Sequence, residues 1–261
     1  MPEIDLTVLL LLALAGLAAG WVDAVVGGGG LIQLPALLLV PGMSPLAAVA
    51  TNKVGSIMGT TVSSITYYRR VHVDLRTALP MAGAALLAAV GGAAIASSIP
   101  EQAFTPIILG ACVAVLVYTV ARPSVGRDNA LRLTGRRHLA AACAIGAVIG
   151  MYDGVLGPGT GSFLVISLVG LLGYAFLQAS GIAKIVNLAT NLGALLFFVP
   201  AGHVVWAAGL AVGVGNLAGG YLGARTAVAR GSGFVRVVFV VVVSVLVVRL
   251  GRQMGDELGW W

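Results

Sequence analysis

The sequence predicts an all-α polytopic membrane protein with about eight to ten transmembrane segments, arranged as two similar halves. The first reason is composition: 59% of the 261 residues are hydrophobic and 9% are charged, whereas about 25% of the residues in a soluble domain are charged. The second is that apolar runs recur from end to end with only brief polar interruptions. The third is that motifs of the first half return in the second. We therefore expect one membrane domain over residues 1–261, with no soluble module attached.

Seven apolar runs are long enough to cross a bilayer. A helix that crosses a hydrocarbon core of about 30 Å needs about 20 mostly apolar residues. The runs that meet this requirement are residues 6–26, 77–98, 103–121, 139–156, 180–200, 204–228 and 233–250. No Lys or Arg precedes the first run, so it lacks the basic region of a cleavable signal peptide and is expected to stay as a span.

Three further stretches differ from ordinary spans. Residues 45–68 are long enough to cross, but they carry Thr, Asn, Lys and Ser throughout, so this helix must face protein or water. Residues 28–41 and 161–177 are apolar but short, and Pro35 interrupts the first of them. The two short stretches are expected to form broken or re-entrant helices.

The longest polar stretch, residues 122–138, divides the chain near its middle and holds five arginines. We interpret it as a cytoplasmic linker between repeat one, about residues 5–121, and repeat two, about residues 139–251. The net charge of +6 is attributed to the positive-inside rule rather than to nucleic-acid binding, because the arginines lie between apolar runs.

Landmarks of the first half return in the second at a nearly constant spacing. Asp23 and Asp153 lie 130 positions apart, and Lys53 and Lys184 lie 131 positions apart. The same displacements relate Gly27 to Gly157, Gly29 to Gly159 and His72 to His203. One inserted residue in the second copy explains the extra position, so the pattern predicts an internal duplication.

Charge placement indicates how the two copies are oriented. If each half crosses five times, the copies are inverted, both termini lie outside, and only Arg249 and Arg252 fall on the outer side. If the short stretches are re-entrant, each half crosses four times and the copies are parallel. Arg225, Arg230 and Arg236 then move outside. The positive-inside rule favours the inverted arrangement and leaves the parallel one open.

Lys53 and Lys184 each lie within a run otherwise suited to the membrane. A charge at the bilayer centre costs about 2.5–3.5 kcal/mol even on the lenient insertion scale, so each lysine is a candidate site residue. The structural alternative is that each amine reaches the membrane surface or pairs with a carboxylate. We expect the two lysines to bind a small anion.

Glycine-rich segments follow the first apolar run of each half. Such turns interrupt a helix, free backbone N–H groups and present a positive helix end to an anion. The residues expected to contribute are Gly28, Gly29 and Gly30 in the first half, and Gly159, Thr160 and Gly161 in the second. Close helix packing is the competing explanation of the glycines.

Asp23 and Asp153 precede the glycine turns by four residues. Three roles are open to them: an acceptor that caps a helix, an ion-pair partner for a lysine, or a proton carrier. Capping or pairing is favoured, because a carboxylate beside an anion would repel it.

Amide and hydroxyl side chains recur near the lysines at about helical spacing. Such donors bind an oxyanion without adding a second full charge. The candidates for substrate binding are Thr51 and Asn52 in the first half and Asn187 and Asn191 in the second. Interhelical hydrogen bonding is an equal alternative.

Enzyme and metal chemistry have little support in the sequence. There is no nucleophile elbow and no HExxH motif, and His72, His138 and His203 lack a second metal ligand at a suitable spacing. We expect neither catalytic activity nor a cofactor.

The segments GWVDAVVGGGGLIQLP, AVATNKVGS, GMYDGVLGPGTGSF and GIAKIVNLATN resemble those of the TauE/SafE family of membrane transporters. The resemblance covers nearly the whole chain. It implies movement of sulfite, sulfonates such as sulfoacetate, or related sulfur-containing anions across the bacterial cytoplasmic membrane. It also implies about seven or eight spans, fewer than the ten that the charge argument favours.

Together these observations predict a secondary transporter of small anions that works by alternating access. Coupling to a proton or another cation and assembly as a homodimer are further expectations. Two other functions remain open: an anion channel, and a membrane enzyme or assembly subunit that binds a lipid-linked phosphate.

Overall fold

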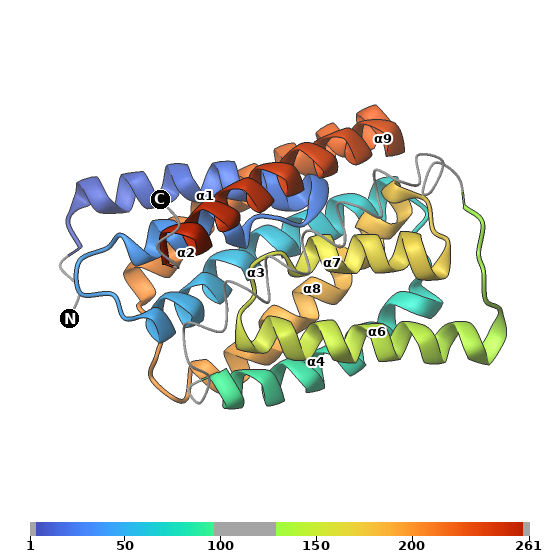
Figure 1. The fold of residues 1–261 in the computed structure, drawn as a ribbon, viewed down its shortest axis with the longest axis horizontal. Coiled ribbons are helices and arrows are strands. Elements are labelled where there is room, and N and C mark those ends of the chain that lie inside the picture. Colours follow the sequence, from blue (N-terminus) through green and yellow to red (C-terminus); the bar gives the residue numbers. More distant parts are fainter. Residues whose placement is uncertain (1–3, 97–128, 258–261) are drawn as a thin grey trace.

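The computed structural model describes residues 4–96 and 129–257, and these residues form a bundle of helices (Figure 1). The predicted span 103–121 lies outside this part of the chain. The helices are α1 (Leu6–Val26), α2 (Gly30–Leu38), α3 (Pro45–Arg70), α4 (Leu75–Ala96), α6 (Gly135–Val155), α7 (Thr160–Ser167), α8 (Phe176–Phe198) and α9 (Trp206–Glu257).

Five of the described helices are long and apolar enough to cross a membrane, namely α1, α4, α6, α8 and residues 206–241 of α9. Their outward faces carry large apolar side chains such as Leu14, Leu87, Val148 and Leu196, as lipid contact requires. The chain is a multi-pass membrane protein. In α9 the helix breaks at Gly231, whose φ is 73°, between the two predicted spans of this region.

The predicted starts of these spans lie within four residues of the observed starts. The largest differences are at α8, which begins at Phe176, and at α6, which begins at Gly135 inside the predicted linker. The polar residues 135–138 form the first turn of α6. A first turn of this kind can lie at the membrane surface, and hydropathy alone does not show that it is helical.

Both short stretches form short helices. α2 has 9 residues, about 13 Å at 1.5 Å per residue, too short to cross the membrane. α7 has 8 residues and continues into a π-helical turn over Leu168–Leu172. The expectation that Pro35 interrupts the first stretch was wrong, because α2 runs through Pro35. Pro35 removes the hydrogen bond to the carbonyl of Leu31 and crowds that carbonyl, which distorts a helix locally but does not have to end it.

Glycine allows two pairs of helices to pack with their backbones in close contact. A Cβ on Gly16 of α1 would lie 2.2 Å from the carbonyl oxygen of Val212 in α9. A Cβ on Gly146 of α6 would lie 2.7 Å from the carbonyl oxygen of Met81 in α4. Gly16 and Gly146 lie 130 positions apart, and Met81 and Val212 lie 131 positions apart, so the two contacts join equivalent positions of the two halves. This match supports the duplication, which we carry forward as a proposal.

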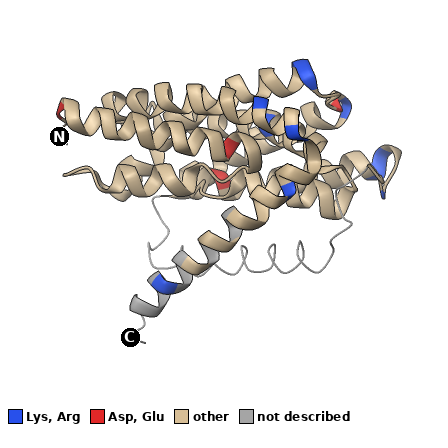
Figure 2. Cartoon of the chain, turned by 90° about the horizontal axis from the view of Figure 1, so that it is seen from above, with Lys and Arg blue, Asp and Glu red and all other residues tan. Residues whose placement is uncertain are grey.

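The helix directions favour inverted copies over parallel ones. Gly215, Gly219 and Gly223 of α9 face successive turns of α1 in the order of the chain, so these two helices run in the same direction. α4 and α6 are also parallel to each other, and Figure 1 shows α6 running opposite to α1. Figure 2 shows most of the blue basic residues toward one end of the bundle, a further blue segment near the C-terminus, and red acidic residues near the middle.

A hydrogen-bonded cluster closes the basic end of the bundle. Asp74 caps α4 through the N–H groups of Arg76 (3.1 Å) and Thr77 (3.4 Å). Its carboxylate also accepts hydrogen bonds from the hydroxyls of Tyr174 and Thr77, both at 2.7 Å. His138 Nε2 lies 2.9 Å from the Tyr174 hydroxyl. The cluster therefore ties the starts of α4, α6 and α8 together.

The Asp74 cluster predicts a pH-dependent loss of stability. Partial burial raises the pKa of the Asp74 carboxyl, but hydrogen bonds from Tyr174, Thr77 and Arg76 outweigh this effect and hold the pKa below its usual value. A lowered folded-state pKa stabilises the protein above pH about 4, and this contribution is lost as the pH falls through the folded-state pKa. Asp74→Ala should cost about 1 kcal/mol at neutral pH, as expected for a lost helix cap.

Thermal unfolding in detergent at neutral and acidic pH measures this effect. The matched control is Asp5→Ala, which removes the exposed cap of α1 and not the cluster. If Asp74→Ala lowers the stability equally at both pH values, the ionised Asp74 carboxylate is not the source of the pH-dependent stability.

Candidate functional site

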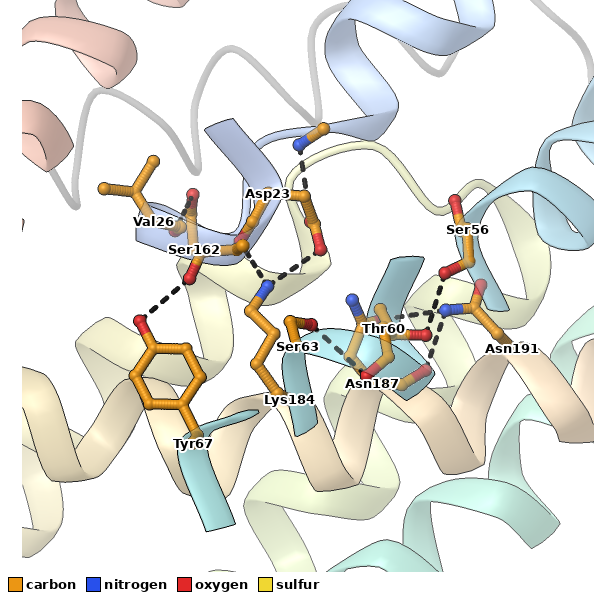
Figure 3. Close-up of polar contacts among 12 residues, drawn as sticks. Asp23, Val26, Ser56, Thr60, Ser63, Tyr67, Ser162, Lys184, Asn187 and Asn191 are labelled. Atoms are coloured by element: carbon orange, nitrogen blue, oxygen red, sulfur yellow. Dashed lines mark hydrogen bonds and ion pairs between the residues drawn. The ribbon is translucent and has the colours of Figure 1, made fainter. Parts of the chain in front are cut away.

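Two polar helix faces meet inside the bundle. On α3 the polar positions 53, 56, 60 and 63 recur every three or four residues, as do positions 184, 187 and 191 on α8, so each set lies on one face of its helix. Figure 3 shows Asn187 and Asn191 beside Ser56 and Thr60, with Lys184 reaching Asp23 of α1. These faces point inward, because α3 packs between α8 and α9.

Lys53 of α3 is held by Asp153 of α6. Its Nζ donates to the main-chain carbonyl of Asp153 at 2.5 Å and lies 2.9 Å from the carboxylate Oδ2. The two side chains are 1% and 2% exposed, so the amine does not reach the membrane surface. The carboxylate Oδ2 accepts no hydrogen bond from the described residues, so the carboxylate holds the amine by charge while the carbonyl holds it by a hydrogen bond.

Lys184 of α8 is held by Asp23 of α1 in the same manner. Its Nζ donates to the main-chain carbonyl of Asp23 and lies 2.8 Å from the carboxylate Oδ2. Lys184 is 0% exposed and Asp23 is 14% exposed. Each lysine thus pairs with an aspartate of the opposite half, a crossed arrangement that the sequence did not reveal.

The second oxygen of each carboxylate binds the glycine turn that follows it. Asp23 Oδ1 accepts the N–H of Gly29 at 3.4 Å, and Asp153 Oδ1 accepts the hydroxyl of Thr160 at 2.7 Å. Ion pairing, one of the three roles open to the aspartates, is therefore present at both. Asp23 also binds a main-chain N–H at the start of α2, whereas Asp153 binds a side-chain hydroxyl of α7. Neither contact bears on the third role, that of a proton carrier.

The two glycine turns lie against each other. A Cβ on Gly27 would lie 2.1 Å from the carbonyl carbon of Gly161, and Gly27 has a φ of 83°. The N–H of Ser162 donates to the Gly27 carbonyl at 3.1 Å, and its hydroxyl donates to the carbonyl of Val26 at 2.9 Å. The end of α1 and the start of α7 are thereby joined at one point.

A small pocket opens where the polar faces, the aspartates and the glycine turns converge. Its empty space of about 250 Å³ includes solvent at the open side, and the part that the centre of a water-sized molecule can enter is about 10 Å³. The lining residues carry polar side chains or are glycines: Asp23, Gly27, Gly30, Asn52, Lys53, Ser56, Asp153, Gly157, Gly161, Asn187 and Asn191. Gly30 and Gly161 belong to the first turns of α2 and α7, where backbone N–H groups lack an intrahelical acceptor.

The structure brings eight of the predicted site residues to this pocket. They are Asp23, Gly30, Asn52, Lys53, Asp153, Gly161, Asn187 and Asn191. The remaining six lie outside its lining. Lys184 and Gly29 bind Asp23 and Thr160 binds Asp153, whereas Gly159 caps α7 and Gly28 accepts the N–H of Leu31. Thr51 accepts the N–H of Val205, a contact that fixes the start of α9 to α3.

Gln33 is a polar residue beside the site that the sequence analysis missed. It is 0% exposed on α2, and its Oε1 accepts the hydroxyl of Ser56 at 3.0 Å. The signal was present, since Gln33 is the one polar side chain in the apolar stretch GLIQLPALL. In residues 4–96 and 129–257, no three His, Cys, Asp or Glu side chains lie close enough together to hold a metal ion.

Comparisons with known proteins agree with this architecture. The family model described as "Sulfite exporter TauE/SafE" matches residues 12–250. The chain is 35% identical to "Probable membrane transporter protein ORF9" of Sinorhizobium sp., over 100% of this chain and 99% of that protein. It is 32% identical to "Probable membrane transporter protein YfcA" of Escherichia coli K12, over 93% and 90% of the two chains. A "Probable membrane transporter protein" of Haemophilus influenzae is 31% identical over 99% of both chains. No solved structure matches this chain.

Proposed function

Since this chain belongs to the TauE/SafE family of membrane transporters, we propose that it carries a small sulfur-containing anion, sulfite or a sulfonate, across the bacterial inner membrane. The supporting observation is the polar pocket inside helices that face lipid, with the Lys53 amine in its lining. Buried polar groups within a membrane domain are expensive to maintain and mark substrate pathways.

The donors around the pocket suit an oxyanion. Lys53 supplies a positive charge, while Asn52, Asn187 and Asn191 supply amide groups that bind oxygen without a further full charge. The first turns of α2 and α7 add main-chain N–H groups and the positive ends of two helix dipoles. Such broken helices near the bilayer midplane are typical of secondary transporters.

Alternating access is the mechanism that we infer. The helices that contribute to the pocket come from both halves of the chain, and each Lys–Asp pair joins one half to the other. Movement of one half against the other would open the pocket to one side of the membrane at a time. A homodimer is carried forward as the assembly, and the mass of the purified particle in detergent tests it.

A thermal-shift screen followed by transport tests the proposal. Purified protein is heated in the presence of sulfite, thiosulfate, sulfoacetate, methanesulfonate, taurine or sulfate, with chloride at equal ionic strength as the control. An anion present at 100 times its Kd should raise the apparent free energy of unfolding by about 2.7 kcal/mol. The same anion, radiolabelled, should exchange across vesicles that contain the protein, with saturation at high concentration. Failure of all six anions to stabilise the protein or to exchange would refute the proposal.

A further inference from the structure

In the crossed Lys–Asp pair of the pocket, Asp153 occupies the Lys53 amine that an anion would bind. Two oxygens of a single residue, the main-chain carbonyl and the carboxylate Oδ2 of Asp153, bind or approach Lys53 Nζ. An ammonium group has three N–H donors, so Asp153 occupies much of its binding capacity. An incoming oxyanion therefore makes strong contacts with Lys53 only if the Asp153 carboxylate moves away.

Charge balance determines what must happen to the released carboxylate. The two lysines and two aspartates of the pairs sum to zero charge. An anion that enters the pocket adds negative charge where the effective dielectric constant is low, and an unpaired buried carboxylate is strongly unfavourable. A proton on that carboxylate restores neutrality for a monoanion.

We propose that transport is coupled to protons and that Asp153 is the proton carrier: the anion replaces the Asp153 carboxylate on Lys53, and the displaced carboxylate takes up one proton. This inference rests on the proposed function. The proton binds Asp153 Oδ2, the oxygen that faces Lys53, while Oδ1 keeps the hydroxyl of Thr160. The anion and the proton then cross together and leave on the same side.

Asp153 is favoured over Asp23 by the lining of the pocket. Lys53 and Asp153 both line it, so exchange between carboxylate and anion occurs within one space. On the other side Asp23 lines the pocket but its partner Lys184 does not. Lys184 is therefore a positioning residue that holds Asp23.

Among residues 4–96 and 129–257, few other ionisable groups face Asp153. Lys53 comes from α3, and Tyr152 is its neighbour on α6, where the Tyr152 hydroxyl donates to the Pro158 carbonyl. Asp23 lies across the pocket with Lys184 of α8. The other elements packed on α6, namely α4 from Thr77 onward, α7 and the π-helical turn, contain no titratable side chain.

Vesicles with an imposed pH gradient test the coupling. Radiolabelled methanesulfonate, thiosulfate, sulfoacetate and sulfite are first tested for equilibrium exchange, with protein-free vesicles as the correction for leakage of neutral sulfurous acid. Each anion that exchanges is then measured with the outside acidic and the membrane potential clamped at zero. One proton per anion should give about tenfold accumulation per pH unit, because one pH unit is equivalent to 1.36 kcal/mol.

Asp153→Asn supplies the decisive variant, because the amide keeps the shape and cannot carry the proton. It should lose the accumulation driven by the gradient, and its equilibrium exchange is measured in parallel to show whether the anion still binds. Asp5→Asn, the same chemical change at the exposed cap of α1, should leave both intact. If the variant does not fold, the wild-type measurement alone still decides whether protons are coupled.

The outcomes separate the two proposals. Exchange without gradient-driven accumulation in the wild type overturns proton coupling and leaves the transport function standing. If Asp153→Asn still accumulates the anion, Asp153 is not the proton carrier. If accumulation is lost in Asp23→Asn and kept in Asp153→Asn, the carrier is Asp23. If none of the anions exchanges, the transport function fails and the coupling fails with it.

Discussion

Replacing Lys53 with Met is expected to lower anion affinity and transport by at least about tenfold. Hydrogen bonds to a charged group contribute about 1.5–3 kcal/mol, and each 1.4 kcal/mol is tenfold in affinity. Met keeps the length of the side chain and removes the charge. The loss is measured as exchange of radiolabelled sulfite or methanesulfonate in vesicles, with the amount of inserted protein determined in each preparation.

The control for this prediction removes both charges of the pair. Lys53→Met alone leaves the buried Asp153 carboxylate without its cation, which can destabilise a protein by about 3–5 kcal/mol. The double variant Lys53→Met with Asp153→Asn has no unpaired charge and should fold. If the double variant still exchanges the anion at the wild-type rate, Lys53 does not bind it. Loss of exchange in a folded double variant is the result that we expect.

Gly27→Ala is expected to destabilise the protein by about 2–5 kcal/mol. The backbone there has a φ of 83°, a left-handed conformation that costs an L-residue about 1–2 kcal/mol. The new Cβ would also lie 2.1 Å from the backbone of Gly161, so the contact between α1 and α7 must open. Overpacking of this kind typically costs about 1–3 kcal/mol more. Thermal unfolding in detergent and the yield of monodisperse protein measure the loss.

Two glycines serve as matched controls for Gly27. Gly202 has a φ of 73° with nothing within 4 Å of an added Cβ, so Gly202→Ala shows the conformational cost alone. Gly233 has an ordinary φ and equally open space, and Gly233→Ala should be neutral or slightly stabilising. A Gly27→Ala effect no larger than that of Gly202→Ala would contradict the proposed close contact.

Element existence was predictable because it depends on local composition. The run 6–26 coincides with α1, the short stretch 28–41 contains α2, and the stretch 161–177 covers all of α7 except its first residue. Length and hydropathy decide whether a segment can cross a bilayer, and both are properties of the segment alone. Helix ends were less accurate, as at α6, because a polar first turn at the membrane surface looks like a linker.

The sequence predicted which residues belong to the candidate site but not how they are arranged in space. Lys53, Lys184, Asp23 and Asp153 stood out because a charge in an apolar run is costly wherever the chain folds. The sequence did not reveal which aspartate meets which lysine. Thr51 is close to Lys53 in sequence but lies off the face formed by positions 53, 56, 60 and 63, and it contacts Val205 rather than the pocket.

The sequence by itself determined that this chain lies in a membrane, that its two halves share landmarks, and that a few charged residues are buried in apolar surroundings. The tertiary structure alone decided that Lys53 meets Asp153 and Lys184 meets Asp23. Partners 100 and 161 positions apart are brought together because α3 and α8, which carry the lysines, pack on each other and on α9 and α4. That packing depends on glycines whose neighbours are specified only when the helices have met.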